Sequence, residues 1–195
     1  MKNKATLNVN DKTLDLDLVI GSENEVALDI SKLRLDANLI TIDAGFKNTG
    51  SCQSAITFLD GENGILRYRG YSIEELANKA DFLEVAYLLI FGELPTESQL
   101  NKISDDIKER SIIDEDLRII LNSYPKSAHP MGILSSLTSG LVAFDPSAVD
   151  IDDEEDMYDA ILNLLAKIPV LVAWVYRRRK GLPLEYGDTS LGYVE

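Results

Sequence analysis

Residues 56–77, ITFLDGENGILRYRGYSIEELA, combine a predicted β-hairpin with the start of a helix and decide the fold of the chain. Two β-prone runs, 56–59 and 65–68, flank the segment Asp60–Gly64, whose two glycines can supply the positive φ angles that a tight reversal needs. Ser72 lies three residues before Glu75, which is the spacing of a capping box at a helix N-terminus. The stretch therefore predicts a hairpin over residues 56–69, followed directly by a helix.

The chain after this stretch reads as a series of helices with clear start and stop signals. Capping pairs precede two of them, glycines end two of them, and prolines mark both ends of another. These signals are Asp81 with Glu84, Thr96 with Gln99, Gly92, Gly181, Pro130 and Asp145-Pro146. The predicted helices cover residues 82–90, 97–109, 114–122, 131–144 and 153–180.

The chain before residue 56 has a different texture. Residues 5–18, ATLNVNDKTLDLDL, alternate polar and apolar side chains around Asn10-Asp11, and residues 39–42 form a further β-prone run. These patterns predict a mainly α fold, in which a small β-rich region over residues 1–54 precedes a partial large helical domain over residues 55–195.

Composition and charge narrow the classes of partner. The formal net charge of −14 argues against nucleic acid or an anionic membrane as a partner, because both are polyanions. The single cysteine, Cys52, and the absence of an apolar leader in the first twenty residues predict a reducing, cytoplasmic setting. The apolar segment 157–176 is interrupted by Asp159, Asn163 and Lys167, so we expect a buried helix and no membrane span, which takes about 20 apolar residues.

Two predicted helices carry surfaces that call for neighbours. In the helix 131–144, small residues recur every four positions, as in Gly132, Ser136 and Gly140, so another backbone can approach closely. The helix 153–180 is apolar on nearly every side between residues 160 and 176, which indicates that other helices surround it. We expect these two helices to form a homo-oligomer interface or to pack against segments outside this chain.

The motifs that suggest ligand chemistry have simpler interpretations. The acidic run 150–156 fails the calcium-loop pattern, because the required glycine and glutamate positions are Glu155 and Ile161, so it predicts a helix N-terminus. The basic run 177–180 predicts the opposite helix end, since four consecutive helical residues point about 100° apart. Without a glycine-rich phosphate loop or a ligand cluster, we expect no resident cofactor and no metal.

Taken together, the motifs of this chain resemble those of the citrate synthases, in the bacterial form with an N-terminal β extension. The motifs follow one another in the order and spacing of that family over essentially the whole chain. They are Ile42-Asp43-Ala44-Gly45-Phe46, Ser51-Cys52, the run 56–61, the run 65–71, the run 83–89, His129-Pro130-Met131 and Leu182-Pro183. The resemblance implies an enzyme that joins acetyl-CoA to oxaloacetate, giving citrate and free CoA, and that dimerises through paired helices, here 131–144 and 153–180.

The resemblance also implies where the chemistry lies. The reaction needs a base at the thioester methyl and donors at the thioester and ketone oxygens. The family supplies an aspartate, two histidines and several arginines. The one histidine here, His129, belongs to the structural motif His129-Pro130-Met131. We therefore expect an N-terminal part of the enzyme, truncated at its C-terminus and inactive alone, with no catalytic or substrate-binding residue. The alternatives are a 2-methylcitrate synthase segment and a non-catalytic helical interaction module.

A regulatory site is a further implication of the resemblance. Some bacterial members bind NADH at an allosteric site formed partly by this region. By resemblance, Arg110 and Lys167 would serve a phosphate of such a nucleotide. The family's Arg-His-Thr motif reads Glu109-Arg110-Ser111 here, and a family tyrosine is replaced around Phe144-Asp145.

Overall fold

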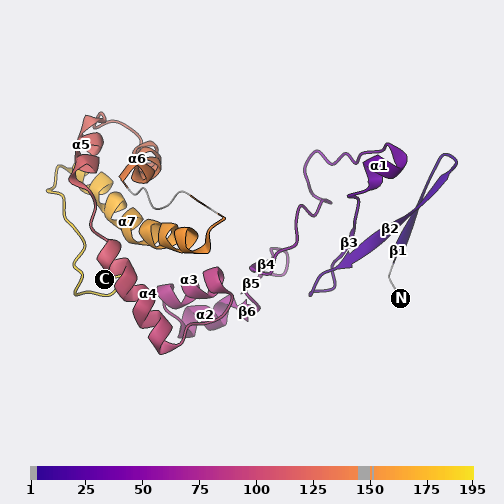
Figure 1. The fold of residues 1–195 in the computed structure, drawn as a ribbon, viewed down its shortest axis with the longest axis horizontal. Coiled ribbons are helices and arrows are strands. Elements are labelled where there is room, and N and C mark those ends of the chain that lie inside the picture. Colours follow the sequence, from indigo (N-terminus) through magenta and orange to yellow (C-terminus); the bar gives the residue numbers. More distant parts are fainter. Residues whose placement is uncertain (1–3, 145–149, 151) are drawn as a thin grey trace. The chain divides into compact units, whose positions relative to one another are not determined.

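The structure is a computed structural model that describes residues 4–144, 150 and 152–195. The chain divides into two compact units, residues 1–55 and residues 56–195, coloured indigo to purple and magenta to yellow in Figure 1. The first unit is a small sheet with one short helix. The second unit is helical except for one small sheet. A mainly α fold with an N-terminal β region is therefore confirmed.

The first unit is built on the alternating segment that the sequence identified. Its three antiparallel strands lie in the order β1-β2-β3, and the turn between the first two is made by Asn10 in the left-handed region, with a φ of 53°. Helix α1 contacts β2 and buries Leu33. The elements are β1 (Lys4–Val9), β2 (Lys12–Ile20), β3 (Val26–Leu28) and α1 (Leu33–Ala37).

The predicted strand over residues 39–42 is wrong. The structure gives these residues no regular secondary structure. The side chains of Ile40 and Ile42 are 76% and 95% exposed, so the run lacks the covered face that stabilises a strand. A β-prone composition gives no strand here because, among the described residues of the first unit, the run is not paired with a neighbouring strand.

The hairpin predicted over residues 56–69 forms, and a short third strand extends it. Strand β4 (Thr57–Asp60) pairs with β5 (Ile65–Tyr68), and β5 pairs with β6 (Tyr71–Ser72). The carboxylate of Asp60 accepts hydrogen bonds from the backbone N–H of Glu62 and Asn63 and from the Asn63 amide, at 3.1, 3.0 and 2.7 Å. The bonds from Asn63 are the main cause that lowers the pKa of Asp60, because they favour the ionised carboxylate.

Helix α2 (Ile73–Lys79) begins at Ser72, but only half of the predicted capping box is present. The Ser72 hydroxyl oxygen accepts a hydrogen bond from the Glu75 backbone N–H at 3.2 Å. The Glu75 carboxylate pairs instead with Lys79, one turn further on, at 3.0 Å. Lys79 competes for the Glu75 carboxylate because the spacing of four residues places both side chains on one face of the helix.

The other start and stop signals act as predicted. Complete capping boxes open α3 and α4, and Gly92 and Gly181 end α3 and α7 with φ angles of 90° and 70°. The predicted stop at Asp145-Pro146 lies outside the described residues. The helices are α3 (Phe82–Phe91), α4 (Glu97–Arg110), α5 (Glu115–Ser123), α6 (Pro130–Phe144) and α7 (Glu154–Lys180).

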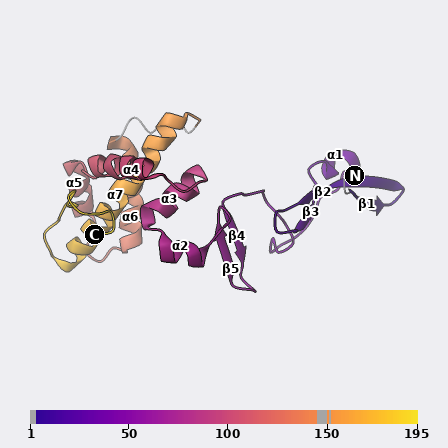
Figure 2. The same cartoon turned by 90° about the horizontal axis from the view of Figure 1, so that it is seen from below.

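Helix α7 is the element against which the second unit packs, and it lies alongside α4 and α6 (Figures 1 and 2). One core cluster joins α5, α6 and α7 around Leu137 and the fully buried Trp174. A second cluster joins α3, α4 and α7 around Ile103 and Leu162. Among the described residues, α7 is also the helix whose length and composition match a membrane span, a test that the core helix of a soluble protein passes equally.

The second cluster predicts that truncating Ile103 destabilises the fold far more than truncating Ile119. Ile103 is 1% exposed and Ile119 is 67% exposed, and both lie inside helices. We expect Ile103→Ala to lower the free energy of unfolding by about 2–5 kcal/mol, because it leaves a cavity between α3, α4 and α7. The matched change Ile119→Ala is expected to cost no more than about 0.5 kcal/mol. Urea unfolding followed by circular dichroism measures both, and equal losses would show that this cluster is not a core.

Candidate functional site

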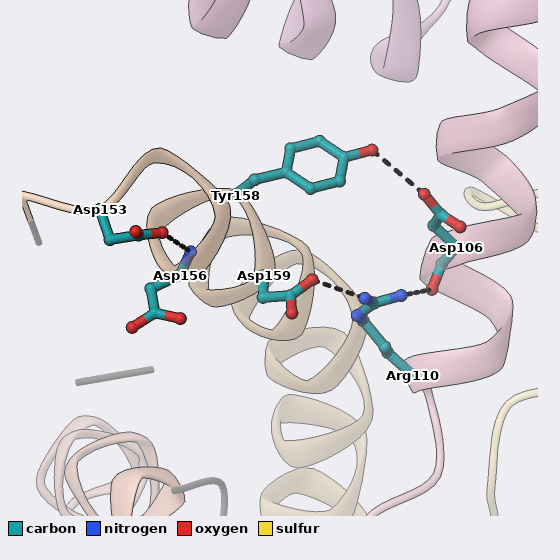
Figure 3. A network of polar contacts seen from close by, with 6 residues as sticks. All are labelled: Asp106, Arg110, Asp153, Asp156, Tyr158 and Asp159. Carbon is teal, nitrogen blue, oxygen red and sulfur yellow. Dashed lines mark hydrogen bonds and ion pairs between the residues drawn. The ribbon is translucent and has the colours of Figure 1, made fainter. Parts of the chain in front are cut away.

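A network of polar contacts joins the C-terminal half of α4 to the first turns of α7 (Figure 3). The Arg110 guanidinium donates to the Asp159 carboxylate at 2.6 Å and to the backbone carbonyl of Asp106 at 3.2 Å. The side chains of Arg110 and Asp159 are 28% and 33% exposed, so the ion pair is partly shielded from water. This shielding makes the ion pair stronger than a fully exposed one.

Tyr158 completes the network from the α7 side. Its hydroxyl donates to the Asp106 carboxylate at 3.1 Å. Burial is the largest cause that raises the pKa of the Tyr158 hydroxyl, and the hydrogen bond to Asp106 raises it further. Lys102 lies above the Tyr158 ring, 6.0 Å from its centre. Two adjacent residues of α7 therefore contact three residues of α4: Tyr158 contacts Lys102 and Asp106, and Asp159 contacts Arg110.

Local helix geometry explains the convergence of these side chains. Asp106 and Arg110 are four residues apart on α4, so they share one face of that helix. On α7 the start is fixed by Asp153, whose carboxylate accepts from the backbone N–H of Glu155 and Asp156 at 2.9 and 3.1 Å. This cap fixes the first turn of α7, and the next residues along the helix, Tyr158 and Asp159, contact α4.

The two predicted nucleotide-binding residues, Arg110 and Lys167, lie in different surroundings on different helices. Arg110 is held by protein groups on both sides, as described above. Lys167 lies eight residues beyond Asp159 on α7, about 12 Å further along the helix axis at 1.5 Å per residue. Phosphate binding by this pair of residues stays a prediction.

A cavity of about 160 Å³ lies between α3, α4, α7 and the segment that follows α7. Leu83, Ile107 and Val170 are among its apolar lining residues, and Ser104, Lys108, Ser111 and Asp188 are among its polar ones. Several hydrogen bonds fix the segment after α7 over the helices. The Trp174 indole N–H donates to the Glu185 carbonyl at 2.8 Å, and the Tyr193 hydroxyl donates to the Leu165 carbonyl at 2.9 Å.

The motif His129-Pro130-Met131 forms the start of α6. The His129 ring nitrogen Nδ1 accepts from the Met131 backbone N–H at 3.2 Å, and the His129 carbonyl accepts from the backbone N–H of Gly132 and Ile133. The imidazole thus satisfies a donor that a helix N-terminus otherwise leaves unpaired. This position gives the histidine a local role at the helix start.

The basic run at the end of α7 diverges, as predicted. Arg177 pairs with Glu185 at 2.5 Å, and Arg178 donates to the carbonyls of Asn122 and Tyr124 at the end of α5. The Lys180 ammonium lies 5.9 Å from the centre of the Tyr176 ring. These cations each serve a different neighbour and do not form one anion site.

Within the described part of the chain, no group of three or more metal-ligating side chains lies close enough to hold an ion. Cys52 is exposed and unpaired with another cysteine. The described residues thus form a helical scaffold that carries the polar network between α4 and α7 and the cavity beside the segment after α7.

The exposed faces of α6 and α7 are rich in apolar or small side chains. On α6, the packing face consists of Ile133, Leu137 and Leu141, whereas a Cβ added at Gly132 would meet no atom within 4 Å. The small-residue stripe is thus open at Gly132, whereas a Cβ added at Gly140 would lie 3.8 Å from the Leu117 side chain and the Ser136 hydroxyl is hydrogen-bonded to the Tyr124 hydroxyl. The large apolar side chains exposed on the two helices are Met131, Val142, Met157, Leu164, Val172 and Tyr176.

Sequence reasoning missed the partners of Arg110. Asp106 carried a usable signal, because it lies four residues before Arg110 on a predicted helix. Asp159 was noticed only as a charge that interrupts an apolar segment. Such a charge within a buried helix requires a partner, but the sequence does not show that the partner is on α4.

Comparisons with known proteins define the class of this fold. The structure resembles a solved citrate synthase from Pyrobaculum aerophilum with a TM-score of 0.69 and 31% identity, covering 76% of this chain and 39% of that one. The corresponding values for a citrate synthase from Thermotoga maritima are 0.68, 32%, 80% and 40%. A ternary complex of the Thermoplasma acidophilum citrate synthase with carboxymethyl coenzyme A and oxaloacetate has a TM-score of 0.72 at 24% identity, which supports the fold alone.

The sequence comparisons define the family. The family model "Citrate synthase, C-terminal domain" matches residues 45–195. A citrate synthase from Corynebacterium glutamicum is 42% identical over 193 residues, which cover 99% of this chain and 44% of that protein. The chain belongs to the citrate synthase family, as the sequence motifs indicated, and spans less than half the length of this relative.

The raised pKa of Tyr158 predicts a loss of stability in alkali. Below the ordinary value of 10.0 the hydroxyl is protonated in both states, whereas above it the unfolded chain releases a proton that the folded chain retains. The free energy of unfolding should fall as the pH rises from 10.0 to the folded pKa, and should fall less in Tyr158→Phe. Urea unfolding over this pH range measures the difference, with exposed Tyr176→Phe as the control. Equal slopes for the two variants would contradict the assignment.

Proposed function

We propose that this chain is a segment of an enzyme that condenses acetyl-CoA with oxaloacetate to give citrate and CoA. The observation that carries the proposal is the 42% identity to the Corynebacterium glutamicum citrate synthase over nearly the whole of this chain. The family model and two solved citrate synthases above 30% identity support the same enzyme class.

The catalytic groups are proposed to lie in the part of the enzyme that this chain does not span. Carbon–carbon bond formation from a thioester needs a base at the methyl group and donors at two developing oxyanions. The chain has a single histidine, His129, and its Nδ1 is used at the start of α6. We therefore assign this segment a scaffold role, without catalytic or substrate-binding residues.

Two alternative functions differ from this proposal in their substrate or in having no catalytic activity. A 2-methylcitrate synthase would share the fold and use propionyl-CoA, and a non-catalytic interaction module would use only the helical surfaces. The named relatives are citrate synthases, and no contact in the described residues favours either alternative.

We also propose a homodimer or larger homo-oligomer through α6 and α7. The exposed apolar side chains of both helices and the open stripe at Gly132 support it, because symmetric interfaces bury such surfaces. A cytoplasmic location, without nucleic acid or membrane partners, is proposed from the charge of −14 and the single thiol. A regulatory nucleotide site that uses Arg110 and Lys167 is proposed from the family resemblance.

The enzymatic proposal predicts a difference between the segment and a completed enzyme. With acetyl-CoA and oxaloacetate, this chain alone should release no thiol above a protein-free blank. A chimera in which the chain replaces the matching segment of the Corynebacterium glutamicum enzyme should release CoA, because the missing groups are then present. A thiol reagent measures both, and the same chimera with propionyl-CoA tests the substrate.

Turnover by the chain alone would contradict the scaffold assignment. A chimera that shows native circular dichroism and no thiol release with either substrate would contradict the enzymatic proposal. A preference for propionyl-CoA would favour the 2-methylcitrate alternative.

The interface proposal predicts self-association in solution. The mass of the chain is 21.6 kDa, so light scattering should give at least about twice this value for a symmetric oligomer. Leu164→Glu should shift the mass towards the monomer, because it places a charge on an exposed apolar position of α7. Ile119→Glu introduces the same charge on α5 and should change nothing. A compact monomer of the unmodified chain would contradict the proposal.

A further inference from the structure

The turn between β4 and β5 holds an asparagine directly before a glycine. Asn63 and Gly64 are both exposed, at the end of the hairpin that β4 and β5 form (Figure 2). Asn63 is the one asparagine of the sequence that a glycine follows. Gly64 has a φ of 68°, and a Cβ added there would meet no atom of the described chain within 4 Å. The backbone on the C-terminal side of Asn63 therefore has open space around it.

We propose that Asn63 is a site of spontaneous deamidation, that Asp60 restrains this reaction in the folded chain, and that the product places two carboxylates against each other in the turn. The proposal concerns the stability of the hairpin and is independent of the enzymatic proposal above.

The reaction needs only the chain and water. The backbone nitrogen of Gly64 attacks the side-chain carbonyl carbon Cγ of Asn63, and the new C–N bond closes a succinimide ring. The Cγ–Nδ2 bond breaks, and the amide nitrogen leaves as ammonia with the proton that the Gly64 nitrogen has lost. Water then opens the ring to aspartate or isoaspartate at position 63. A glycine favours ring closure because it has no Cβ beside the attacking nitrogen.

The Asp60 carboxylate holds the amide that must react. It accepts hydrogen bonds from the Asn63 backbone N–H at 3.0 Å and from Asn63 Nδ2 at 2.7 Å. The side-chain bond is the largest cause that lowers the pKa of Asp60, so the acceptor is an ionised carboxylate, which forms stronger hydrogen bonds than a neutral group. Because Nδ2 is the leaving atom, deamidation must break the 2.7 Å bond, and Asp60 therefore slows it.

The product cannot form these contacts again. An aspartate or isoaspartate at position 63 has no side-chain N–H to donate, and at neutral pH it carries a negative charge beside Asp60. Two carboxylates that share a site repel each other. Isoaspartate also adds one carbon atom to the backbone of the turn. The turn thus loses a hydrogen bond and gains a repulsion, which weakens the pairing of β4 with β5.

Other exposed asparagines provide an internal comparison. Asn24 and Asn48 are exposed as well, but Glu25 and Thr49 follow them. The side chains of these following residues hinder the attacking nitrogen, so we expect Asn24 and Asn48 to keep their amides while Asn63 loses its own.

The test is peptide mass spectrometry of the folded chain during incubation in warm, mildly alkaline buffer. The peptide with Asn63 should gain the mass difference between an amide and a carboxylic acid. Asp60→Ala should make this gain at least about threefold faster, because it removes both hydrogen bonds from Asn63. Glu62→Ala is the matched control, because it removes a carboxylate from the same turn and keeps those two bonds. Its rate should equal that of the unmodified chain.

Thermal unfolding tests the effect of the product. Asn63→Asp reproduces the aspartate form, and Asn63→Ala removes the amide without adding a charge. Both lose the bond from Nδ2 to Asp60, but only Asn63→Asp places a second carboxylate beside Asp60. The midpoint of unfolding should therefore be lower for Asn63→Asp than for Asn63→Ala.

Circular dichroism first establishes that each variant is folded. An unchanged mass at Asn63, or an equal gain at Asn24 and Asn48, would overturn the site. A rate in Asp60→Ala no higher than in Glu62→Ala would overturn the restraint by Asp60. Equal midpoints for Asn63→Asp and Asn63→Ala would overturn the repulsion in the product. These measurements do not depend on thiol release, so their failure is separate from a failure of the enzymatic proposal.

Discussion

The helical unit depends on the burial of α7 against α4 on one side and α5 and α6 on another. Trp174 is fully buried in this interface, and side chains of its size cost about 3–5 kcal/mol when truncated in a core. Leu162 and Ala166, about three and two turns earlier, bury against α3 and α4. Because both clusters share one helix, α7 couples the two halves of the unit, and the segment after it is fixed by the hydrogen bond from Trp174 to Glu185.

This architecture explains why polar groups at the seam are paired within the chain. A charge near a packed helix interface loses part of its hydration, and the ion pair between Arg110 and Asp159 offsets part of this desolvation cost. The same applies to Tyr158 and Asp106, whose hydrogen bond lies beside the Leu162 cluster. The packing of α7 on α4 thus also brings these polar side chains into their pairs.

Much of the fold could be predicted because its signals are local. The Asp60 loop, the capping boxes at Asp81 and Thr96, and the left-handed Gly92 and Gly181 depend on residues within a few positions of one another. The failed strand at residues 39–42 shows the limit, because a strand needs a partner that composition does not reveal. At Ser72, a competing contact from Lys79 to Glu75 removed half of a box that spacing alone predicted.

The family, the order of the helices and the start of α6 at His129 follow from the sequence alone, because they depend on motifs and on neighbouring residues. The sequence also contained Arg110, Asp106 and Asp159, but as separate charges on separate segments. The contact between Asp159 and Arg110 is visible only in the folded chain, since residues 49 positions apart are brought together by the packing of α7 on α4. That pairing is a property of helix packing, which local sequence patterns do not encode.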